Sequence, residues 1–308
     1  MQIGFIGLGT MGANMASNLQ KAGHDLVIND IRADAGAKHL AAGASWADTA
    51  REVAASSDLV FTSLPGPSEV REVSRQLLEG FKPGAAYFDL STSSPTLARQ
   101  IHKEFAEREV HMLDAPVSGG PSGAKSGKLA IWVGGDRAVF DQHREKLDAI
   151  GDQVMYVGPI GAGSVTKLVH NCAGYMIQTA MAEVFSLGVK AGVDPLDLWS
   201  AVRQGAVGRS RTFDRLVSQF LAGAFDPPSF ALRLAHKDVT LATELARELN
   251  VPMRSANLAL AELTEALNRG WGTRDSRTAM LLQEERAGVE IAVSPERIRA
   301  AEAKLSAF

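Results

Sequence analysis

The chain has 308 residues, of which 45% are hydrophobic and 22% are charged, and its formal net charge is −3. This length suits two globular domains, and the weak net charge argues against a nucleic-acid partner. The single cysteine, Cys172, excludes an internal disulfide and argues against a cysteine-based zinc site, so we expect no bound metal.

The sequence shows no membrane-spanning or export signal. No stretch approaches the roughly 20 consecutive apolar residues that a membrane-spanning helix needs. The apolar opening segment is rich in glycine, and no basic residues precede it, which argues against a signal peptide. We therefore expect a cytoplasmic protein that does not contact a membrane.

The first feature in chain order is an apolar strand that runs into a glycine-rich turn. Residues 3–12 read IGFIGLGTMG, so Gly7, Gly9 and Gly12 form a GxGxxG pattern, and a helix is predicted at residues 13–22. Gly7 permits the tight turn, Gly9 lets a pyrophosphate approach the backbone, and Gly12 lets the helix pack on the sheet. The pattern predicts a dinucleotide-binding βαβ unit rather than an ordinary glycine-rich turn. Its expected cofactor contacts are Gly7, Leu8, Gly9, Thr10, Met11 and Gly12.

An acidic residue follows the second apolar strand, at residues 26–29. Asp30 stands about 20 residues after the glycine pattern, where a carboxylate can hydrogen-bond the ribose 2′-hydroxyl of NAD and repel the 2′-phosphate of NADP. Ile31 comes next, and Arg32 is close enough in sequence to reach a phosphate. The pattern favours NAD and leaves NADP open.

Strand and helix patterns alternate through the first half of the chain. The predicted strands are residues 2–6, 26–29, 59–63, 86–89, 111–114, 129–133 and 154–156. The predicted helices are residues 13–22, 33–42, 68–78, 96–107 and 138–150. This alternation predicts an α/β Rossmann domain, in which a doubly wound and mostly parallel sheet binds ligands at the carboxyl ends of its strands.

The pattern changes near residue 162, which we take as the domain boundary. Residues 164–190 are apolar on nearly all faces, as in a buried helix, and no strand pattern follows. Further helices are predicted at residues 195–203, 212–222, 232–249, 255–269 and 275–287. The sequence thus predicts a Rossmann domain at residues 1–162, an all-α domain for substrate binding and oligomerisation at residues 163–288, and a helical tail at residues 289–308.

A glycine-rich segment follows the strand at residues 111–114. In the sequence DAPVSGGPSGA, the hydroxyl of Ser118 and the backbone N–H groups of Gly119 and Gly120 would form a nest for a small carboxylate. A plain connection between two strands would have the same composition. Spacing alone leaves both interpretations open.

The long apolar helix opens with GAGSVTKLVHN, residues 161–171. Lys167 and Asn171 are four residues apart, so they lie on one helix face. Desolvation would lower the pKa of Lys167 toward neutrality, as a general acid or base requires, and Asn171 would orient a substrate oxygen. Alternatively, Lys167 reaches solvent or pairs with an acid. His170 either lines the pocket or has a structural role.

Together these features resemble one family, the β-hydroxyacid dehydrogenases, which includes 3-hydroxyisobutyrate dehydrogenase, tartronate semialdehyde reductase and relatives of 6-phosphogluconate dehydrogenase. The resemblance covers about residues 1–285 and rests on GFIGLGTMG (4–12), LP (64–65), DLSTSSP (89–95), DAPVSGG (114–120), GAGSVTKLVHN (161–171) and HKD (236–238). It implies an NAD(P)-dependent oxidoreductase that transfers hydride between the nicotinamide and a small β-hydroxy acid or semialdehyde. It also implies a small anionic substrate and a homodimer or homotetramer.

The resemblance assigns roles residue by residue. Lys167 matches the catalytic lysine that carries the proton to or from the substrate oxygen, and Asn171 matches the asparagine that helps to hold the substrate. The loop that binds the substrate carboxylate matches Ser118, Gly119 and Gly120. The remaining cofactor contacts match Asp30, Leu64, Pro65, Thr92 beside the nicotinamide ribose, and Lys237, a lysine of the second domain.

Some positions depart from the family pattern. Many members read KxxNN, whereas His170 replaces the first asparagine here. Arg209 and Arg211 occur where we expect a less basic pocket edge, so they either face solvent or pair with a second anionic group of the substrate. Imine reduction and a non-catalytic dinucleotide-binding role on the same fold are the alternative functions. The intact loop at residues 118–120, together with Lys167, argues against imine reduction. The presence of both Lys167 and Asn171 argues against a non-catalytic role.

Overall fold

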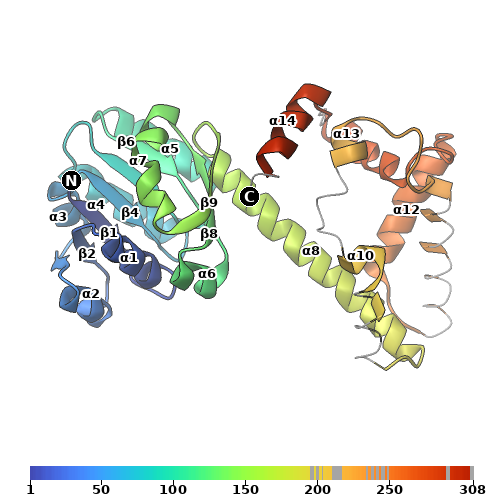
Figure 1. The fold of residues 1–308 in the computed structure, drawn as a ribbon, viewed down its shortest axis with the longest axis horizontal. Helices are drawn as coiled ribbons and strands as arrows, with labels where there is room; N and C mark the ends of the chain where they lie inside the picture. The colour runs from blue at the N-terminus through green and yellow to red at the C-terminus, as the bar shows by residue number, and fades with distance from the viewer. Residues whose placement is uncertain are drawn as a thin grey trace. The chain divides into compact units, whose positions relative to one another are not determined.

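The computed structural model describes residues 1–194, 198, 201–202, 204–209, 217–233, 235–236, 239–240, 243, 247, 250–288 and 292–305. The chain divides into two compact units, Met1–Ala173 and Gly174–Phe308 (Figure 1). The boundary inferred at residue 162 coincides with the start of a long helix, α8 (Ala162–Lys190), whose first turns belong to the first unit. The domain limits inferred from the sequence stay a prediction.

The first unit alternates strands and helices, as expected. Its strands are β1 (Ile3–Ile6), β2 (Leu26–Asn29), β3 (Ser45–Trp46), β4 (Leu59–Thr62), β5 (Ala86–Asp89), β6 (His111–Asp114), β7 (Val117–Ser118), β8 (Leu129–Gly134) and β9 (Gly151–Gly158). Its helices before α8 are α1 (Gly12–Lys21), a 3₁₀ turn (Ala33–Gly36), α2 (Ala37–Ala41), α3 (Ala50–Ala55), α4 (Pro67–Gly80), α5 (Pro95–Ala106), α6 (Gly120–Ser126) and α7 (Arg137–Asp148). Every strand and helix predicted for this part of the chain is present, and the short elements β3, β7, α3 and α6 are additional.

The strands form one sheet in the order β3-β2-β1-β4-β5-β6-β8-β7, with β9 beside β8. Neighbours from β3 to β6 are parallel, whereas β8 runs antiparallel to β6 and β7 and parallel to β9. The mostly parallel Rossmann sheet predicted from the sequence is therefore confirmed. Because parallel strands end at the same edge, the loops after β1, β2, β4, β5 and β6 lie along one edge of the sheet.

Helices bury both faces of this sheet. Successive residues of a strand point to opposite faces, so Phe61 joins one core while its neighbour Val60 joins the other. The first core packs the sheet against Met15 of α1 and Phe140 of α7, and the second packs it against α3, α4 and α5, which contributes Phe105. Burial on both faces explains why these strands read as continuous apolar runs in the sequence.

In the described part of the second unit, the regular elements are helical. They are the end of α8, α10 (Ala206–Arg209), a π-helical turn (Val217–Leu221), α12 (Arg254–Asn268), a 3₁₀ turn (Ser276–Met280), α13 (Leu281–Ala287) and α14 (Pro295–Leu305). The single helix predicted at residues 275–287 is instead broken in two, because the carboxylate of Asp275 accepts the N–H of Arg277 and starts a 3₁₀ turn before α13. The helix predicted at 212–222 is described from residue 217 onward, where it is a π-helical turn.

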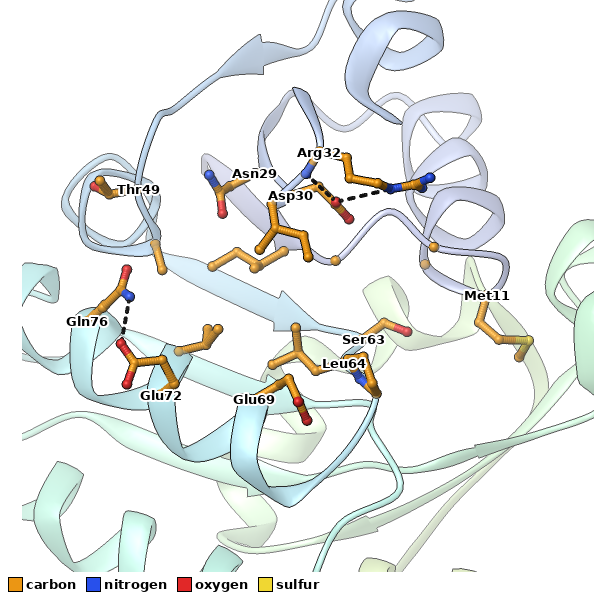
Figure 2. A pocket seen from close by; sticks show the side chains of 18 of the residues that line it. Met11, Asn29, Asp30, Arg32, Thr49, Ser63, Leu64, Glu69, Glu72 and Gln76 are labelled. Atoms are coloured by element: carbon orange, nitrogen blue, oxygen red, sulfur yellow. Dashed lines mark hydrogen bonds and ion pairs between the residues drawn. The ribbon is translucent and has the colours of Figure 1, made fainter. Parts of the chain in front are cut away.

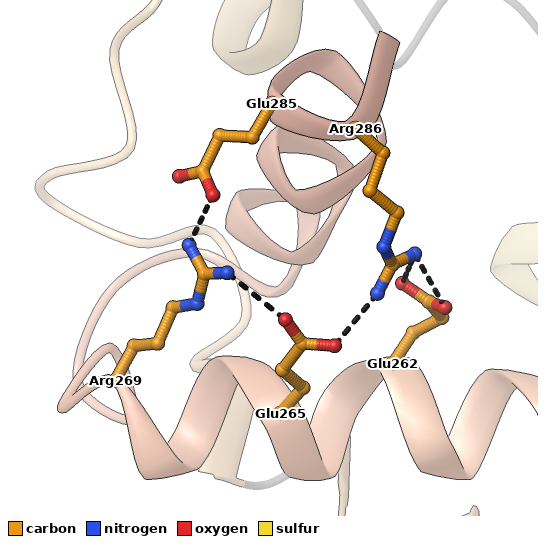
Figure 3. A network of polar contacts seen from close by, with 5 residues as sticks. All are labelled: Glu262, Glu265, Arg269, Glu285 and Arg286. Carbon is orange, nitrogen blue, oxygen red and sulfur yellow. Dashed lines mark hydrogen bonds and ion pairs between the residues drawn. The ribbon is translucent and has the colours of Figure 1, made fainter.

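Ion pairs join α12 to α13 on the surface of the second unit (Figure 3). Arg286 contacts Glu262 at 2.8 Å and Glu265 at 2.6 Å, while Arg269 contacts Glu265 at 2.9 Å and also pairs with Glu285. Exposed ion pairs of this kind each add roughly a few tenths of a kcal/mol to the free energy of unfolding. The network therefore orients α13 on α12 more than it stabilises the fold.

Within the described ranges, no helix has a stretch that is both long and apolar enough to cross a membrane.

Candidate active site

A cavity of about 990 Å³ lies at the edge of the sheet where β1, β2 and β4 end (Figure 2). The glycine turn after β1, the acidic end of β2 and the first turns of α4 surround it. The residues predicted to contact the cofactor that line this cavity are Gly7, Gly9, Thr10, Met11, Gly12, Asp30, Leu64 and Pro65.

The three glycines of the turn differ in what surrounds them. Gly7 has φ of 90°, and a Cβ atom there would lie 2.3 Å from the carbonyl oxygen of Ser63. A Cβ atom on Gly12 would lie 1.8 Å from the carbonyl oxygen of Gly7. A Cβ atom on Gly9, in contrast, would meet no protein atom within 4 Å. The protein itself therefore requires glycine at positions 7 and 12, whereas the space at Gly9 fits the close approach of a ligand.

The N-terminus of α1 is suited to an anion. Its N-cap residue, Met11, makes no side-chain hydrogen bond to the helix, and the first turn holds no acidic residue. The N–H groups of Ala13 and Asn14 already donate to the carbonyl oxygens of Gly9 and Met11. The positive end of the helix dipole and the backbone of the turn before it still favour a phosphate at this position. The turn and the helix start together fit the pyrophosphate of a dinucleotide.

The carboxylate of Asp30 holds the glycine turn and remains available to a ligand. One oxygen accepts the N–H of Leu8 at 2.6 Å, and the other accepts the N–H of Arg32 at 2.9 Å and lies 4.0 Å from its Nε. Each carboxylate oxygen has a second lone pair, which can accept a ribose hydroxyl. The side chain of Leu8 lies in the core, so Leu8 supports the turn through its backbone and does not line the cavity.

Buried hydrogen bonds fix the loops after β4 and β5. The carboxylate of Asp89 accepts the hydroxyl of Thr62 at 2.9 Å and the N–H of Ser91 at 3.0 Å, and the hydroxyl of Ser91 accepts the N–H of Leu64 at 2.8 Å. Burial raises the pKa of Asp89 to about 6. Thr92, the predicted contact of the nicotinamide ribose, follows Ser91 and is exposed at this same edge.

A second buried carboxylate fixes the start of α8. Asp114 lies beside Asp89 in the sheet, and its two oxygens accept the N–H of Gly161 at 2.7 Å and the N–H of Ser164 at 2.5 Å. Burial raises the pKa of Asp114 as well. Sequence reasoning assigned no role to either aspartate. The available signal was that each one stands at the end of an apolar strand.

The start of α8 carries the predicted reaction residues. Lys167 and Asn171 are both half-buried on one helix face. Burial lowers the pKa of Lys167, and among the described residues no carboxylate pairs with it. The alternative in which an acid neutralises this lysine therefore finds no support in the described part of the chain.

The predicted carboxylate loop reaches the same helix face. The hydroxyl of Ser118, at the end of β7, lies 3.0 Å from Nε2 of His170, which is one helical turn after Lys167. Gly119 and Gly120 have φ of 134° and 62°, conformations that favour glycine, and α6 begins at Gly120. The structure thus brings Ser118 beside the turn of α8 that carries Lys167.

Two predicted residues, Lys237 and Arg211, lie outside the described residues. Arg209 is exposed at the end of α10 in the second unit. Among the residues that the structure describes, no group of three or more His, Cys, Asp and Glu side chains is arranged to hold a metal ion.

Two family models together match most of the chain. The model described as the NAD binding domain of 6-phosphogluconate dehydrogenase matches residues 2–158, and that described as the NAD-binding of NADP-dependent 3-hydroxyisobutyrate dehydrogenase matches residues 161–283. The chain is 35% identical over 294 residues to 2-(hydroxymethyl)glutarate dehydrogenase of Eubacterium barkeri, covering 94% of this chain and 97% of that protein. It is 36% identical over 284 residues to NAD-dependent L-serine dehydrogenase of Pseudomonas aeruginosa, covering 89% and 95%.

Solved structures show the same architecture. The 3-hydroxyisobutyrate dehydrogenase of Mycobacterium tuberculosis, determined with L-serine, is similar with a TM-score of 0.65 and 28% identity, over 92% of this chain and 98% of that one. An imine reductase from Pseudomonas sp. has a TM-score of 0.78 over 91% and 98%, but only 18% identity, so this likeness concerns the fold alone.

Proposed function

The chain belongs to the β-hydroxyacid dehydrogenase family, and we propose that it interconverts a small β-hydroxy acid and its semialdehyde with Lys167 as general acid and base. Membership makes it an NAD(P)-dependent oxidoreductase. The observation that carries the residue roles is the hydrogen bond between Ser118 and His170, because it joins the carboxylate loop to the helix turn of Lys167. A substrate carboxylate and its reacting hydroxyl need these two groups at neighbouring positions.

The residues of this chain supply binding and proton transfer. Ser118 and the N–H groups of Gly119 and Gly120 bind the substrate carboxylate, and Asn171 holds the reacting oxygen. The Nζ atom of Lys167 takes the hydroxyl proton in oxidation and returns it in reduction. Since burial lowers the pKa of this lysine, more of its neutral form is available as a base near neutral pH. The bound nicotinamide accepts or supplies the hydride.

We also propose that NAD is the preferred cofactor. The carboxylate of Asp30 accepts a ribose hydroxyl, whereas the 2′-phosphate of NADP would bring a second negative charge against it. Arg32, the base nearest in sequence, already lies against Asp30. Asp30→Asn should therefore narrow the preference for NAD over NADP, as measured by kcat/KM with each cofactor.

The main experiment measures initial rates at the absorbance band of the reduced nicotinamide. NAD and NADP are each tested with 3-hydroxyisobutyrate, glycerate, 3-hydroxypropionate, serine, threonate and sulfolactate. Lys167→Met should lower kcat by about 10²- to 10⁴-fold, the usual contribution of a general acid or base, and should retain NAD affinity. Lys125→Met, at an exposed position of α6, is the matched control. Near-wild-type kcat in Lys167→Met would show that the assigned role is wrong.

Turnover of sulfolactate alone would point to a second anionic group on the substrate, because sulfolactate carries a sulfonate in addition to its carboxylate. Silence of the wild-type enzyme across the panel, with NAD binding intact, would contradict the hydroxy-acid reaction and favour imine reduction or a non-catalytic role.

Assembly and location follow from the resemblance to the family. We propose a homodimer or homotetramer that acts in the cytoplasm on a small anionic substrate. Size-exclusion chromatography with light scattering tests the assembly, and a monomer at micromolar concentration would contradict it.

A further inference from the structure

His39, in α2, is a buried histidine that the mechanism above does not use. The residue is 1% exposed, and its helix is only five residues long, too short to be stable in water without contacts to its neighbours. The helix stands between two stretches of chain that line the cavity at the ends of β1, β2 and β4, residues 30–32 before it and residues 48–49 after it. The contacts that hold His39 therefore bear on the wall of that cavity.

A side chain of α1 holds His39 and fixes the position of its ring hydrogen. The amide nitrogen of Gln20 donates to the carbonyl oxygen of His39 at 3.0 Å and to that of Ala42 at 3.2 Å. Because a carbonyl oxygen only accepts, the amide nitrogen must face these two oxygens, and the amide oxygen is then the atom that lies 2.8 Å from Nδ1 of the ring. That oxygen also only accepts. Nδ1 therefore carries the hydrogen of the neutral ring, and Nε2 carries the lone pair.

The second ring nitrogen of His39, Nε2, is buried and has no hydrogen-bond partner among the described residues. Protonation would place a charged N–H group where no acceptor meets it. The charged residues on the elements around the ring give no compensation. Lys38 of α2 is positive, Lys21 of α1 is exposed and bonded to Asn18, and Asp34 of the preceding 3₁₀ turn is exposed. Burial, and then the charge of Lys38, lower the pKa of His39.

Further contacts join α2 to the cavity wall. The carbonyl oxygen of His39 also accepts the N–H of Ala44, just before β3. A Cβ atom on Gly36 would lie 2.8 Å from the ring of Trp46 in β3, so the turn before α2 packs closely on that ring. The Nε1–H of Trp46 donates in turn to the carboxylate of Asp48 at 3.0 Å, and Asp48 lines the cavity. Release of α2 from α1 would therefore loosen the wall on both sides of the helix.

We propose that His39 is a positioning residue whose neutral ring holds α2 on α1 and keeps the cavity wall in the form that binds NAD, and whose protonation favours a released state in which α2 has left α1. A histidine ring in water titrates near pH 6.5, whereas the docked site favours the neutral ring. The ratio of released to docked protein should therefore rise as pH falls, by up to about tenfold between pH 7.5 and 5.5. The inference rests on the placement of NAD in this cavity and is independent of which hydroxy acid reacts.

Hydrogen exchange measures the released state even when it is a small fraction of the protein. In the full chain without cofactor, the opening constant of α2, corrected for the intrinsic exchange rate at each pH, should be about five- to tenfold larger at pH 5.5 than at pH 7.5. In His39→Gln, which does not titrate and still donates to Gln20, the opening constant should change less than about twofold. An opening constant that does not change in the wild type, or that changes equally in both proteins, would overturn the inference.

His143→Gln is the matched control. His143, in α7, is also buried, its Nδ1 has no partner among the described residues, and burial lowers its pKa. No residue of α7 lines the cavity. This variant should keep the wild-type change at α2, whereas loss of the change in both variants would mean that acid loosens the whole unit, and the inference would be wrong. If His39→Gln fails to fold, His39→Leu serves instead, since it is neutral and suits a buried site.

Adding NAD separates a positioning role from a purely structural one. If the docked wall binds NAD and the released state does not, NAD at about 100 times its Kd should lower the opening constant of α2 by up to about 100-fold. A purely structural role would leave the opening of α2 unchanged by NAD. Calorimetry distinguishes the two ways to fail. If the chain does not bind NAD, the proposed cofactor is wrong, and if it binds NAD while α2 opens as before, only the role of His39 is wrong.

Discussion

Replacing Gly9 with alanine should weaken dinucleotide binding without weakening the fold. A Cβ atom there meets no protein atom within 4 Å, and the backbone is not in the left-handed region, so the folded state accepts the methyl group. Alanine also restricts the unfolded chain, which stabilises the protein by about 0.4–1 kcal/mol. The same methyl group occupies the space through which a pyrophosphate would approach the backbone. Loss of one or two charge-assisted hydrogen bonds, at about 1.5–3 kcal/mol in total, weakens binding roughly 10- to 150-fold.

Gly12→Ala is the matched control, because there the obstacle is the protein itself. The new Cβ atom would lie 1.8 Å from the carbonyl oxygen of Gly7, so the turn must move, at a cost of about 3 kcal/mol or more. Urea denaturation gives the stability of both variants, and titration calorimetry with NAD gives the affinity. Wild-type NAD affinity in Gly9→Ala would refute the placement of the pyrophosphate at this turn. A marked loss of stability in Gly9→Ala would refute the claim that the space there is free.

Three further predictions concern the buried carboxylates and the ion pairs of the second unit. Asp89 has a folded-state pKa of about 6 against about 3.9 in an unfolded chain, so its contribution to stability is lost as pH rises from about 4 to 6, by about 3 kcal/mol. Asp89→Asn lacks this titration, so its free energy of unfolding relative to wild type should rise by about 2–2.5 kcal/mol between pH 4 and 7, as measured by urea denaturation. A difference that stays constant with pH would contradict the argument. Asp114→Asn turns an amide N–H toward one of the two backbone donors, so the free energy of unfolding should fall by about 1–3 kcal/mol, as thermal denaturation would show. Because these donors fix the start of α8, kcat should fall as well, as steady-state kinetics would show. Arg286→Met should change the free energy of unfolding by less than about 1 kcal/mol, because its ion pairs are exposed; a larger loss would mean that they support the fold of the second unit.

Local sequence patterns determined much of the first unit. The buried strands are continuous apolar runs because both faces of the sheet are covered. In the amphipathic helices between them, apolar residues recur at the helical spacing, which predicts each helix. The same patterns missed the two-residue strands β3 and β7, because so short a segment has no period and exists only through pairing with its neighbours. The short helix α6 was missed for a related reason. Its glycine-rich sequence favours a loop, and the helical conformation there depends on tertiary packing against β8 and α1.

The residues of the candidate site also fall into two groups, those that the sequence predicted and those that only the tertiary structure revealed. The sequence by itself predicted the glycine turn and Asp30 from their spacing, and it predicted the roles of Ser118 and Lys167 from the resemblance to the family. Only the tertiary structure showed that Asp89 and Asp114 fix the loops and the helix that carry these groups, and that His170 contacts Ser118 across 52 residues of sequence. The physical reason is that a hydrogen bond between distant segments depends on where the sheet places the ends of those segments. A local pattern of apolar residues contains no information about the distance between them in space.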